Sequence, residues 1–415
     1  MENLGVRVAV VGAGYAGMAA AVALAGRRVP VTVFEAGPVP GGRARRVQSR
    51  GETFDNGQHI LSGAYRELLR LMQVVGVPSG ALLRVPLELR YADGFAFRAA
   101  RLPGPLGTLA GLLSSRRLPW SERFGAVRFM LALRRSGFHL ENDLAVSELL
   151  GKFGQSGAIG HYLWRPLCVS ALNTPPELAS ANAFLAVLRD ALAGEGGSSD
   201  LLLPRVDLSR LFPEPACEFV ARHGGEIRTG TAVRSVSPDL KINGEPFDRA
   251  IVAVGPYQLD GLLPGMAPAF SYQPITTCYL QYAASVRLPF PMLGFAGGLV
   301  QWVFDRGALT GEGGRLACVI SAQGDHQQMQ QDELAAACDR ELRTALPGLG
   351  PVRTFRVISE KRATIACSPR RPRIAQTTSI PGLFLAGDYT DPEYPPVLEA
   401  AVRSGLRAAD LALPG

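Results

Sequence analysis

The fold is decided near the N-terminus, where residues 6–35 read VRVAVVGAGYAGMAAAVALAGRRVPVTVFE. The apolar run at 7–11 predicts a buried strand, the small residues at 16–25 predict a closely packed helix, and 31–35 predicts a second strand. Between the first strand and the helix lies Gly12-Ala13-Gly14-Tyr15-Ala16-Gly17, which is GxGxxG where a dinucleotide-binding β–α–β unit requires it. The sequence therefore predicts a Rossmann-type fold.

Each glycine of this motif has its own physical reason. Gly12 makes the tight turn, Gly14 lets the backbone approach a pyrophosphate, and Gly17 lets the helix pack closely on the strand. The pyrophosphate then rests on the positive N-terminus of the helix. Glu35 ends the second strand, 18 residues after Gly17, where its carboxylate can hold a ribose hydroxyl and repel a 2′-phosphate.

Two further segments distinguish FAD from NAD. Gly41-Gly42-Arg43 predicts a loop over the pyrophosphate, with Arg43 adding charge-assisted hydrogen bonds. Residues 383–405 read LFLAGDYTDPEYPPVLEAAVRSG, which predicts a strand ending at Gly387-Asp388 and a helix beginning near Val397. Asp388 can accept hydrogen bonds from ribityl hydroxyls, and the helix N-terminus can stabilise negative charge on a reduced flavin. NAD enzymes do not need this second half-site, so we expect FAD.

The GxGxxG turn, the spacing from Glu35 to Gly41-Gly42-Arg43 and the late Ala-Gly-Asp resemble the flavin amine oxidase and phytoene desaturase superfamily. The resemblance implies an α/β fold, with a discontinuous Rossmann-type FAD-binding domain and an inserted α+β substrate domain of helices and an antiparallel sheet. The FAD-binding domain is expected at 1–75, 205–256 and 365–415, and the substrate-binding, membrane-associating domain at 76–204 and 257–364. The expected FAD contacts are Gly12, Gly14, Ala16, Gly17, Glu35, Ala36, Gly42, Arg43, Gly57, Gln58, Val233, Gly387, Asp388 and Val397.

A more specific resemblance covers most of the chain. FDNGQHILSGAY at 54–65, WRPLCVSALNTPPE at 164–177 and the C-terminal segment are similar to the squalene-associated flavoproteins, the hydroxysqualene dehydroxylases of hopanoid synthesis. This resemblance implies a polyprenoid substrate and reduction of hydroxysqualene to squalene by FADH2. It also implies that residues 54–59 pass beside the flavin ring.

Few side chains are candidates for the chemistry. His59 is the candidate acid or orienting group, and a buried histidine satisfied by backbone is the alternative. Asp55 and Glu399 are secondary candidates with a structural role as the alternative. Trp164, Arg165 and Asn173 are expected either at the substrate entrance or in the core.

Three other functions remain open from the residues alone. A carotenoid-type desaturase would use the flavin in the opposite direction, and no residue sets the direction of electron flow. In an amine oxidase, Tyr389 and Tyr394 would form an aromatic cage. A flavin-binding membrane protein without catalysis is the third. A second strand–GxGxxG–helix unit is not found, so a separate NAD(P)H site is not expected and the electron donor is left open.

Charge and composition indicate the surroundings of the protein. Of a net charge of +7, segment 101–138 carries +6, from seven arginines and one glutamate, within an apolar stretch. This pattern favours an anionic membrane surface, with a solvated helix face as the alternative, and nucleic acid is not expected because aromatic residues are sparse there. The six cysteines lack metal-like spacing, and residues 1–5 lead directly into a strand without a signal-peptide pattern. We therefore expect no metal site, and a cytoplasmic protein attached peripherally to the inner membrane.

Overall fold

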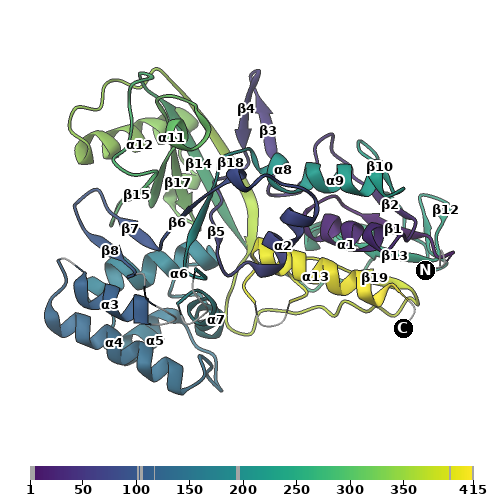
Figure 1. The fold of residues 1–415 in the computed structure, drawn as a ribbon, viewed down its shortest axis with the longest axis horizontal. Helices are drawn as coiled ribbons and strands as arrows, with labels where there is room; N and C mark the ends of the chain where they lie inside the picture. Colours follow the sequence, from purple (N-terminus) through teal and green to yellow (C-terminus); the bar gives the residue numbers. More distant parts are fainter. Residues whose placement is uncertain are drawn as a thin grey trace.

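A computed structural model describes residues 5–413 except 101, 103–105, 116, 193–196 and 392–393. A parallel sheet with strand order β10-β2-β1-β13-β19 lies at the end of the molecule that holds both chain termini (Figure 1). Its strands are β1 (Val8–Val11), β2 (Val31–Phe34), β10 (Glu226–Arg228), β13 (Arg249–Val252) and β19 (Leu383–Leu385). Strands far apart in sequence therefore pair in one sheet.

Small residues bring the helices close to this sheet and to one another. Helix α1 (Tyr15–Gly26) contacts α13 (Leu398–Leu411) along its length, and the two lie side by side in Figure 1. A Cβ on Gly405 of α13 would lie 2.0 Å from the carbonyl oxygen of Ala16, so only glycine permits this approach. Helix α9 (Pro213–Arg222) also packs on α1. The run of small residues at 16–25 thus forms the predicted tight helix.

The second large sheet is antiparallel and has the strand order β15-β16-β17-β14-β18. Its strands are β14 (Tyr272–Gln281), β15 (Met292–Gly294), β16 (Trp302–Asp305), β17 (Arg315–Ser321) and β18 (Thr354–Ile365). Helix α12 (Gln331–Ala345) packs against β14 and β18. Residues 325–327 form a separate 3₁₀ turn before α12 begins at Gln331. The fold class, a parallel Rossmann-type sheet plus an antiparallel sheet with helices, is confirmed.

A helical region lies at the opposite end of the molecule from the termini (Figure 1). Its elements are α3 (Leu106–Ser114), α4 (Trp120–Arg135), α5 (Val146–Lys152), a π-helical turn (Gly160–Trp164), α6 (Arg165–Leu172) and α7 (Ala181–Leu192). Pro166 does not interrupt this helical region. Pro166 follows the π-helical turn, in which the amide of Arg165 donates to the carbonyl of Gly160 five residues earlier, and the helix continues through Pro166 into α6.

Short elements complete the described chain. They are β3 (Arg46–Ser49), β4 (Glu52–Asp55), β5 (Leu61–Ser62), α2 (Arg66–Val74), β6 (Leu82–Val85), β7 (Glu88–Arg90), β8 (Ala96–Arg98), β9 (Leu201–Pro204), α8 (Leu208–Leu211), β11 (Lys241–Ile242), β12 (Glu245–Pro246), α10 (Pro256–Leu262) and α11 (Arg306–Thr310). Residues 197–199 form a turn before β9, and 193–196 lie outside the described residues. The domain boundaries given above stay a prediction.

Candidate active site

A cavity of about 1110 Å³ lies at the carboxyl edge of the parallel sheet. Gly12, Glu35, Val254 and Gly387 line it, each following the end of a different parallel strand. The carboxyl edge of such a sheet is where doubly wound folds bind nucleotides. The facing wall comes from α6, β14, β18 and the segment after β4, so the cavity lies between the two sheets.

The GxGxxG turn has the geometry that its glycines require. Gly12 has φ +105°, and a Cβ there would lie 2.8 Å from the carbonyl oxygen of Ala253. A Cβ on Gly17 would lie 1.9 Å from the carbonyl oxygen of Gly12. On Gly14, by contrast, the nearest atom to an added Cβ is Cα of Gly42, at 3.8 Å. Gly12 and Gly17 therefore make the turn compact, while Gly14 faces open space in the cavity wall.

The second glycine loop lies directly on this turn. The amide of Gly41 donates to the carbonyl of Ala13 at 2.8 Å, and Gly41 and Gly42 both have positive φ. Arg43 follows them, and its Nη2 donates to Oδ2 of Asp388 at 2.7 Å while Nη1 donates to the carbonyl of Ala363 at 2.9 Å. The two predicted cofactor residues Arg43 and Asp388, 345 residues apart, are thus joined by an ion pair.

Comparison with known proteins identifies this arrangement. The sequence model described as "Flavin containing amine oxidoreductase" matches residues 15–413. A hydroxysqualene dehydroxylase of Rhodopseudomonas palustris is 30% identical, and one of Sinorhizobium fredii is 28% identical, each over 98% of both chains. The chain belongs to the hydroxysqualene dehydroxylase family of flavin-containing amine oxidoreductases.

More distant similarities agree with the family. A 15-cis-phytoene desaturase of Solanum lycopersicum is 23% identical over 97% of this chain and 76% of its own length. An oxidoreductase structure from Methanosarcina mazei superposes with a TM-score of 0.74 at 15% identity, covering 97% of this chain and all of the other. These support the family's fold, and the desaturase reading is not favoured because the dehydroxylases are the more similar relatives.

FAD is the cofactor of the family, and buried polar atoms in this cavity fit it. Asp388 is 4% exposed, and its Oδ1 has no hydrogen-bond partner among the described residues. An orphaned buried carboxylate oxygen costs free energy unless a ligand donor satisfies it, and a ribityl hydroxyl is such a donor. Tyr389 beside it also has a buried hydroxyl without a partner among those residues. Val397 caps α13, whose N-terminus faces the cavity and can stabilise a reduced flavin anion.

The predicted adenosine contacts lie farther along the same cavity. Glu35 accepts from the amide of Ala13 at 2.9 Å and from the amide of Gly37 at 2.8 Å. These bonds hold its carboxylate at the cavity wall, where each oxygen retains a lone pair for a ribose hydroxyl. The remaining predicted contacts that line the cavity are Ala16, Ala36, Gly42, Gln58, Val233 and Gly387. Gly17 and Gly57 do not line it, and a Cβ on Gly17 would meet the carbonyl of Gly12 inside the turn.

His59 lines the cavity next to Gln58. Its one hydrogen bond within the described residues runs from Nδ1 to the carbonyl of Gly57, at 3.4 Å. Burial lowers the pKa of His59 below its ordinary value, and the charge of Arg43 lowers it further, while the Gly57 carbonyl opposes both. The imidazole is therefore neutral at pH 7, and it becomes a strong proton donor whenever it is protonated.

Most of the other candidates have structural roles. Glu399 is fully buried and accepts from the amides of Glu67 and Leu68, which caps α2, and it pairs with Arg403. Trp164 is buried in the helical region and donates to Gln155. Neither residue lines the cavity.

Other candidates divide between surface and cavity wall. Arg165 makes a surface ion pair with Glu177. Asn173 lines the cavity but uses its amide to join the end of α6 to β14, β17 and β18. Tyr394 hydrogen-bonds to Asp190 away from the cavity, so the tyrosine cage expected for an amine oxidase is not formed.

Sequence reasoning missed part of the facing wall. Ser170 and Ala171 of α6, Ile275 of β14 and Thr364 of β18 line the cavity. In the sequence, only the segment 164–177 indicated any of these residues, and it includes those of α6 but not those of the strands. Nothing in the local sequence of β14 or β18 indicates which residues face a cavity assembled across two sheets.

Proposed function

We propose that the protein reduces hydroxysqualene to squalene, with FADH2 as the two-electron donor. The observation that carries this proposal is one continuous cavity that joins the dinucleotide turn to apolar side chains such as Ile60, Ala171 and Ile275 in a member of this family. A flavin-sized polar groove ending in an apolar wall suits a long hydrocarbon substrate. The relatives named hydroxysqualene dehydroxylase support the choice of substrate.

The reaction needs three things from the chain. The hydroxyl of the substrate is allylic, so its departure leaves a delocalised cation, and reduced FAD, when bound, supplies the hydride that quenches it. The protein must protonate the leaving oxygen, orient the allylic carbon, and exclude water that would compete for the cation. We assign protonation of the leaving oxygen to His59, which lies on the cavity wall beside the segment expected next to the flavin.

We also propose the FAD contacts residue by residue. Gly12, Gly14, Ala16 and Gly17 form the pyrophosphate turn, Glu35, Ala36 and Val233 receive the adenosine half, and Gly42 and Arg43 cover the pyrophosphate. Gln58, Gly387, Asp388 and Val397 surround the flavin half, and Gly57, at φ +94°, turns the backbone that presents Gln58. The cavity position of most of these residues and the free oxygen of Asp388 support this assignment.

A single-turnover experiment tests the reaction. Enzyme reduced with deuterium at flavin N5 under anaerobic conditions should yield squalene that carries deuterium at the carbon that held the hydroxyl, with one oxidised flavin per product. His59→Ala should slow this step by about 10²–10⁴-fold while FAD content stays unchanged. If oxidised enzyme desaturates phytoene while reduced enzyme leaves hydroxysqualene intact, the protein is a desaturase and the proposal is wrong.

We propose, in addition, that α3 and α4 dock on an anionic bilayer. Trp120, Phe124 and Leu131 project from one face of α4 and are 62%, 56% and 39% exposed. Exposed arginines flank them at 128, 134 and 135, while Arg123 lies over the Trp120 ring. Apolar side chains bordered by arginines fit a lipid surface. Among the described residues no helix is long and apolar enough to cross a bilayer.

Vesicle flotation tests the docking surface. Three arginines near an anionic surface contribute about 1 kcal/mol each, so replacing Arg128, Arg134 and Arg135 by Gln should weaken binding to phosphatidylglycerol vesicles about 100-fold. The matched control replaces Arg222, Arg340 and Arg353, exposed arginines on other elements. Equal binding by the two triple variants would rule out this surface. Arg101 and Arg116, also in the expected basic segment, lie outside the described residues.

A further inference from the structure

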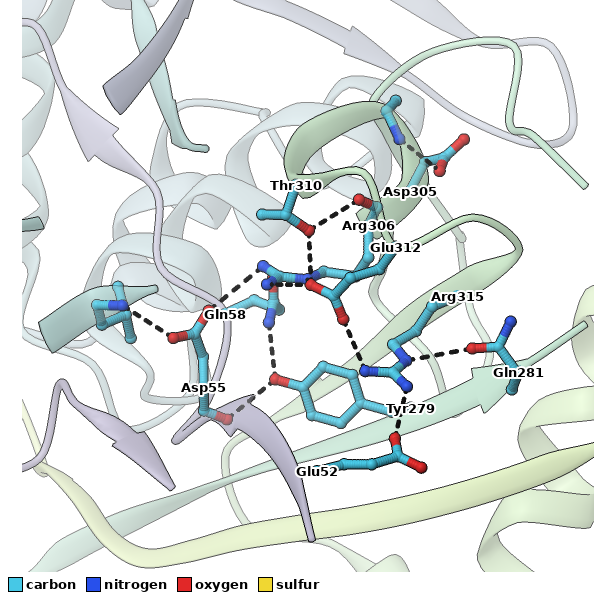
Figure 2. A network of polar contacts seen from close by, with 12 residues as sticks. Glu52, Asp55, Gln58, Tyr279, Gln281, Asp305, Arg306, Thr310, Glu312 and Arg315 are labelled. Atoms are coloured by element: carbon cyan, nitrogen blue, oxygen red, sulfur yellow. Dashed lines mark hydrogen bonds and ion pairs between the residues drawn. The ribbon is translucent and has the colours of Figure 1, made fainter. Parts of the chain in front are cut away.

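A buried polar network includes Asp55, Gln58 and Arg306 (Figure 2), and Gln58 directly precedes His59 in the chain. Asp55, at the end of β4, is 2% exposed, and its Oδ1 accepts from the amide of Leu208 at 2.9 Å. Its Oδ2 lies 3.3 Å from Nη1 of Arg306, the first residue of α11. Arg306 is buried as well and forms a second ion pair with Glu312 at 2.8 Å. The network thus joins β4, α8 and α11.

The same network holds Gln58 from both sides. Its Nε2 donates to the hydroxyl of Tyr279 at 2.8 Å, and its Oε1 accepts from Nη1 of Arg306 at 3.3 Å. The Tyr279 hydroxyl in turn donates to the backbone carbonyl of Asp55 at 2.9 Å. With both ends of its amide engaged, Gln58 has one orientation, and the segment that leads to His59 is held with it.

A second, small cavity of about 10 Å³ lies within this network. Its polar wall is Asp55, Gln58, His59 and Arg306, and the rest is apolar, including Leu203 and Leu309. Gln58 and His59 line both this cavity and the large one, so they form the partition between Asp55 and the substrate space. A buried water needs about 10–15 Å³ and two to four polar partners, and this cavity supplies both.

We infer that one water in the small cavity links the carboxyl group of Asp55 to the imidazole of His59, and that Asp55 supplies the proton that His59 delivers to the substrate. The inference rests on the proposed function and extends it to the source of the proton. The Asp55 proton passes through the water to the imidazole, and the imidazole gives a proton to the leaving oxygen as the C–O bond breaks. The substrate gains this proton and one hydride from reduced FAD, and its hydroxyl departs as water. Solvent later restores the proton to Asp55.

The charges around both groups suit this transfer. Burial raises the pKa of Asp55 to about 6, and the carboxylates of Asp207 and Glu312 act in the same direction, while Arg306 and the Leu208 amide oppose them. The phenol groups of Tyr15 and Tyr279 also face Asp55. An acid with a pKa near the working pH holds a proton and still releases it, and the lowered pKa of His59 makes the protonated imidazole short-lived.

Two measurements on the FAD-loaded protein test the link. In single turnover with hydroxysqualene, wild-type flavin reoxidation should slow as the pH rises above about 6, whereas Asp55→Asn should be about 10–100-fold slower at pH 6 and independent of pH there. Independently of turnover, ¹⁵N NMR of the labelled histidines should show the His59 signals responding to the ionisation of Asp55 near pH 6 in the wild type, and this inflection should be absent in Asp55→Asn. Glu52→Gln is the matched control, since Glu52 carries the same charge and pairs with Arg315 at 2.6 Å but does not line the small cavity, and it should preserve both behaviours.

A further variant separates the water from the carboxyl group. Leu309→Met places a longer, flexible side chain at the small cavity and should displace the water with Asp55 intact, giving the same loss of rate and pH dependence. FAD content and the unfolding temperature report whether each variant is folded. A folded Asp55→Asn with the wild-type rate, pH profile and His59 NMR titration curve would overturn the inference. Wild-type enzyme that does not react with hydroxysqualene would instead refute the proposed function, and the NMR titration would still decide the Asp55–His59 link.

Discussion

Asp388 connects the fold to the cofactor through its two carboxylate oxygens. Oδ2 accepts from Arg43 at 2.7 Å, with side chains 28% and 5% exposed, while Oδ1 is buried and free to accept from FAD. Asp388→Ala removes both acceptors. Because the two oxygens have different partners, we expect two separable losses, one in the stability of the FAD-free protein and one in FAD affinity.

The magnitudes follow from the kind of bond that is lost. A hydrogen bond to a charged group contributes about 1.5–3 kcal/mol, so loss of the ribityl contact should raise the Kd for FAD about 10–100-fold. Loss of the Arg43 partner should lower the free energy of unfolding of the FAD-free protein by about 1–3 kcal/mol. In the double variant Arg43→Met/Asp388→Ala, the unpaired guanidinium is gone, so part of this stability should return while FAD affinity should not.

The assays are fluorescence titration with FAD and urea unfolding of the FAD-free protein. Asp388→Asn is the conservative comparison, because it keeps an acceptor at the position of Oδ1 and removes the charge. It should lose less FAD affinity than Asp388→Ala. A folded Asp388→Ala variant with wild-type FAD affinity would refute the assignment of Oδ1 to the cofactor. If Arg43→Met/Asp388→Ala recovered stability and FAD affinity equally, the two oxygens would not have separate roles.

Three further outcomes are expected. Gly14→Val should abolish FAD binding and leave the unfolding temperature of the FAD-free protein unchanged, because the added side chain enters the open cavity. Gly17→Ala should instead destabilise the fold, because its Cβ would lie 1.9 Å from the Gly12 carbonyl oxygen. Differential scanning calorimetry compares the unfolding temperatures of the two variants. Glu399→Gln should lower the free energy of unfolding by about 2 kcal/mol, because one oxygen that caps α2 and the charge paired with Arg403 are lost. An unchanged midpoint in urea unfolding would contradict the capping role. Burial raises the pKa of Asp55 to about 6, so its protonated form favours folding. Between about pH 4 and pH 6, ionisation of Asp55 should therefore lower the free energy of unfolding by about 3 kcal/mol. Urea titrations of wild type and Asp55→Asn at pH 4 and pH 7 isolate this contribution, and an equal difference between the two proteins at both pH values would argue against it.

The Rossmann sheet and its nucleotide edge were predictable from the sequence because their signals are local. The glycines at 12, 14 and 17 each answer a steric requirement within a few residues, and Glu35 and Asp388 follow apolar strands whose carboxyl ends must meet in a parallel sheet. The small residues of α1 likewise indicated close helix packing. Motifs of this kind depend on backbone geometry, which nearby residues determine.

Only the tertiary structure decided what surrounds these motifs. The fold also joins Arg43 to Asp388 and to β18, contacts that the local motif does not indicate, because these residues meet only when distant segments converge. The fold likewise brings Arg306 to Asp55 and to Gln58, which lie 251 and 248 positions earlier in the sequence. Gln58 forms the partition together with His59. The sequence determined which residues can turn, cap and bind, since those capacities are local. Which of them share a cavity, and with what pKa, depends on burial and neighbours that exist only once the two sheets have packed together.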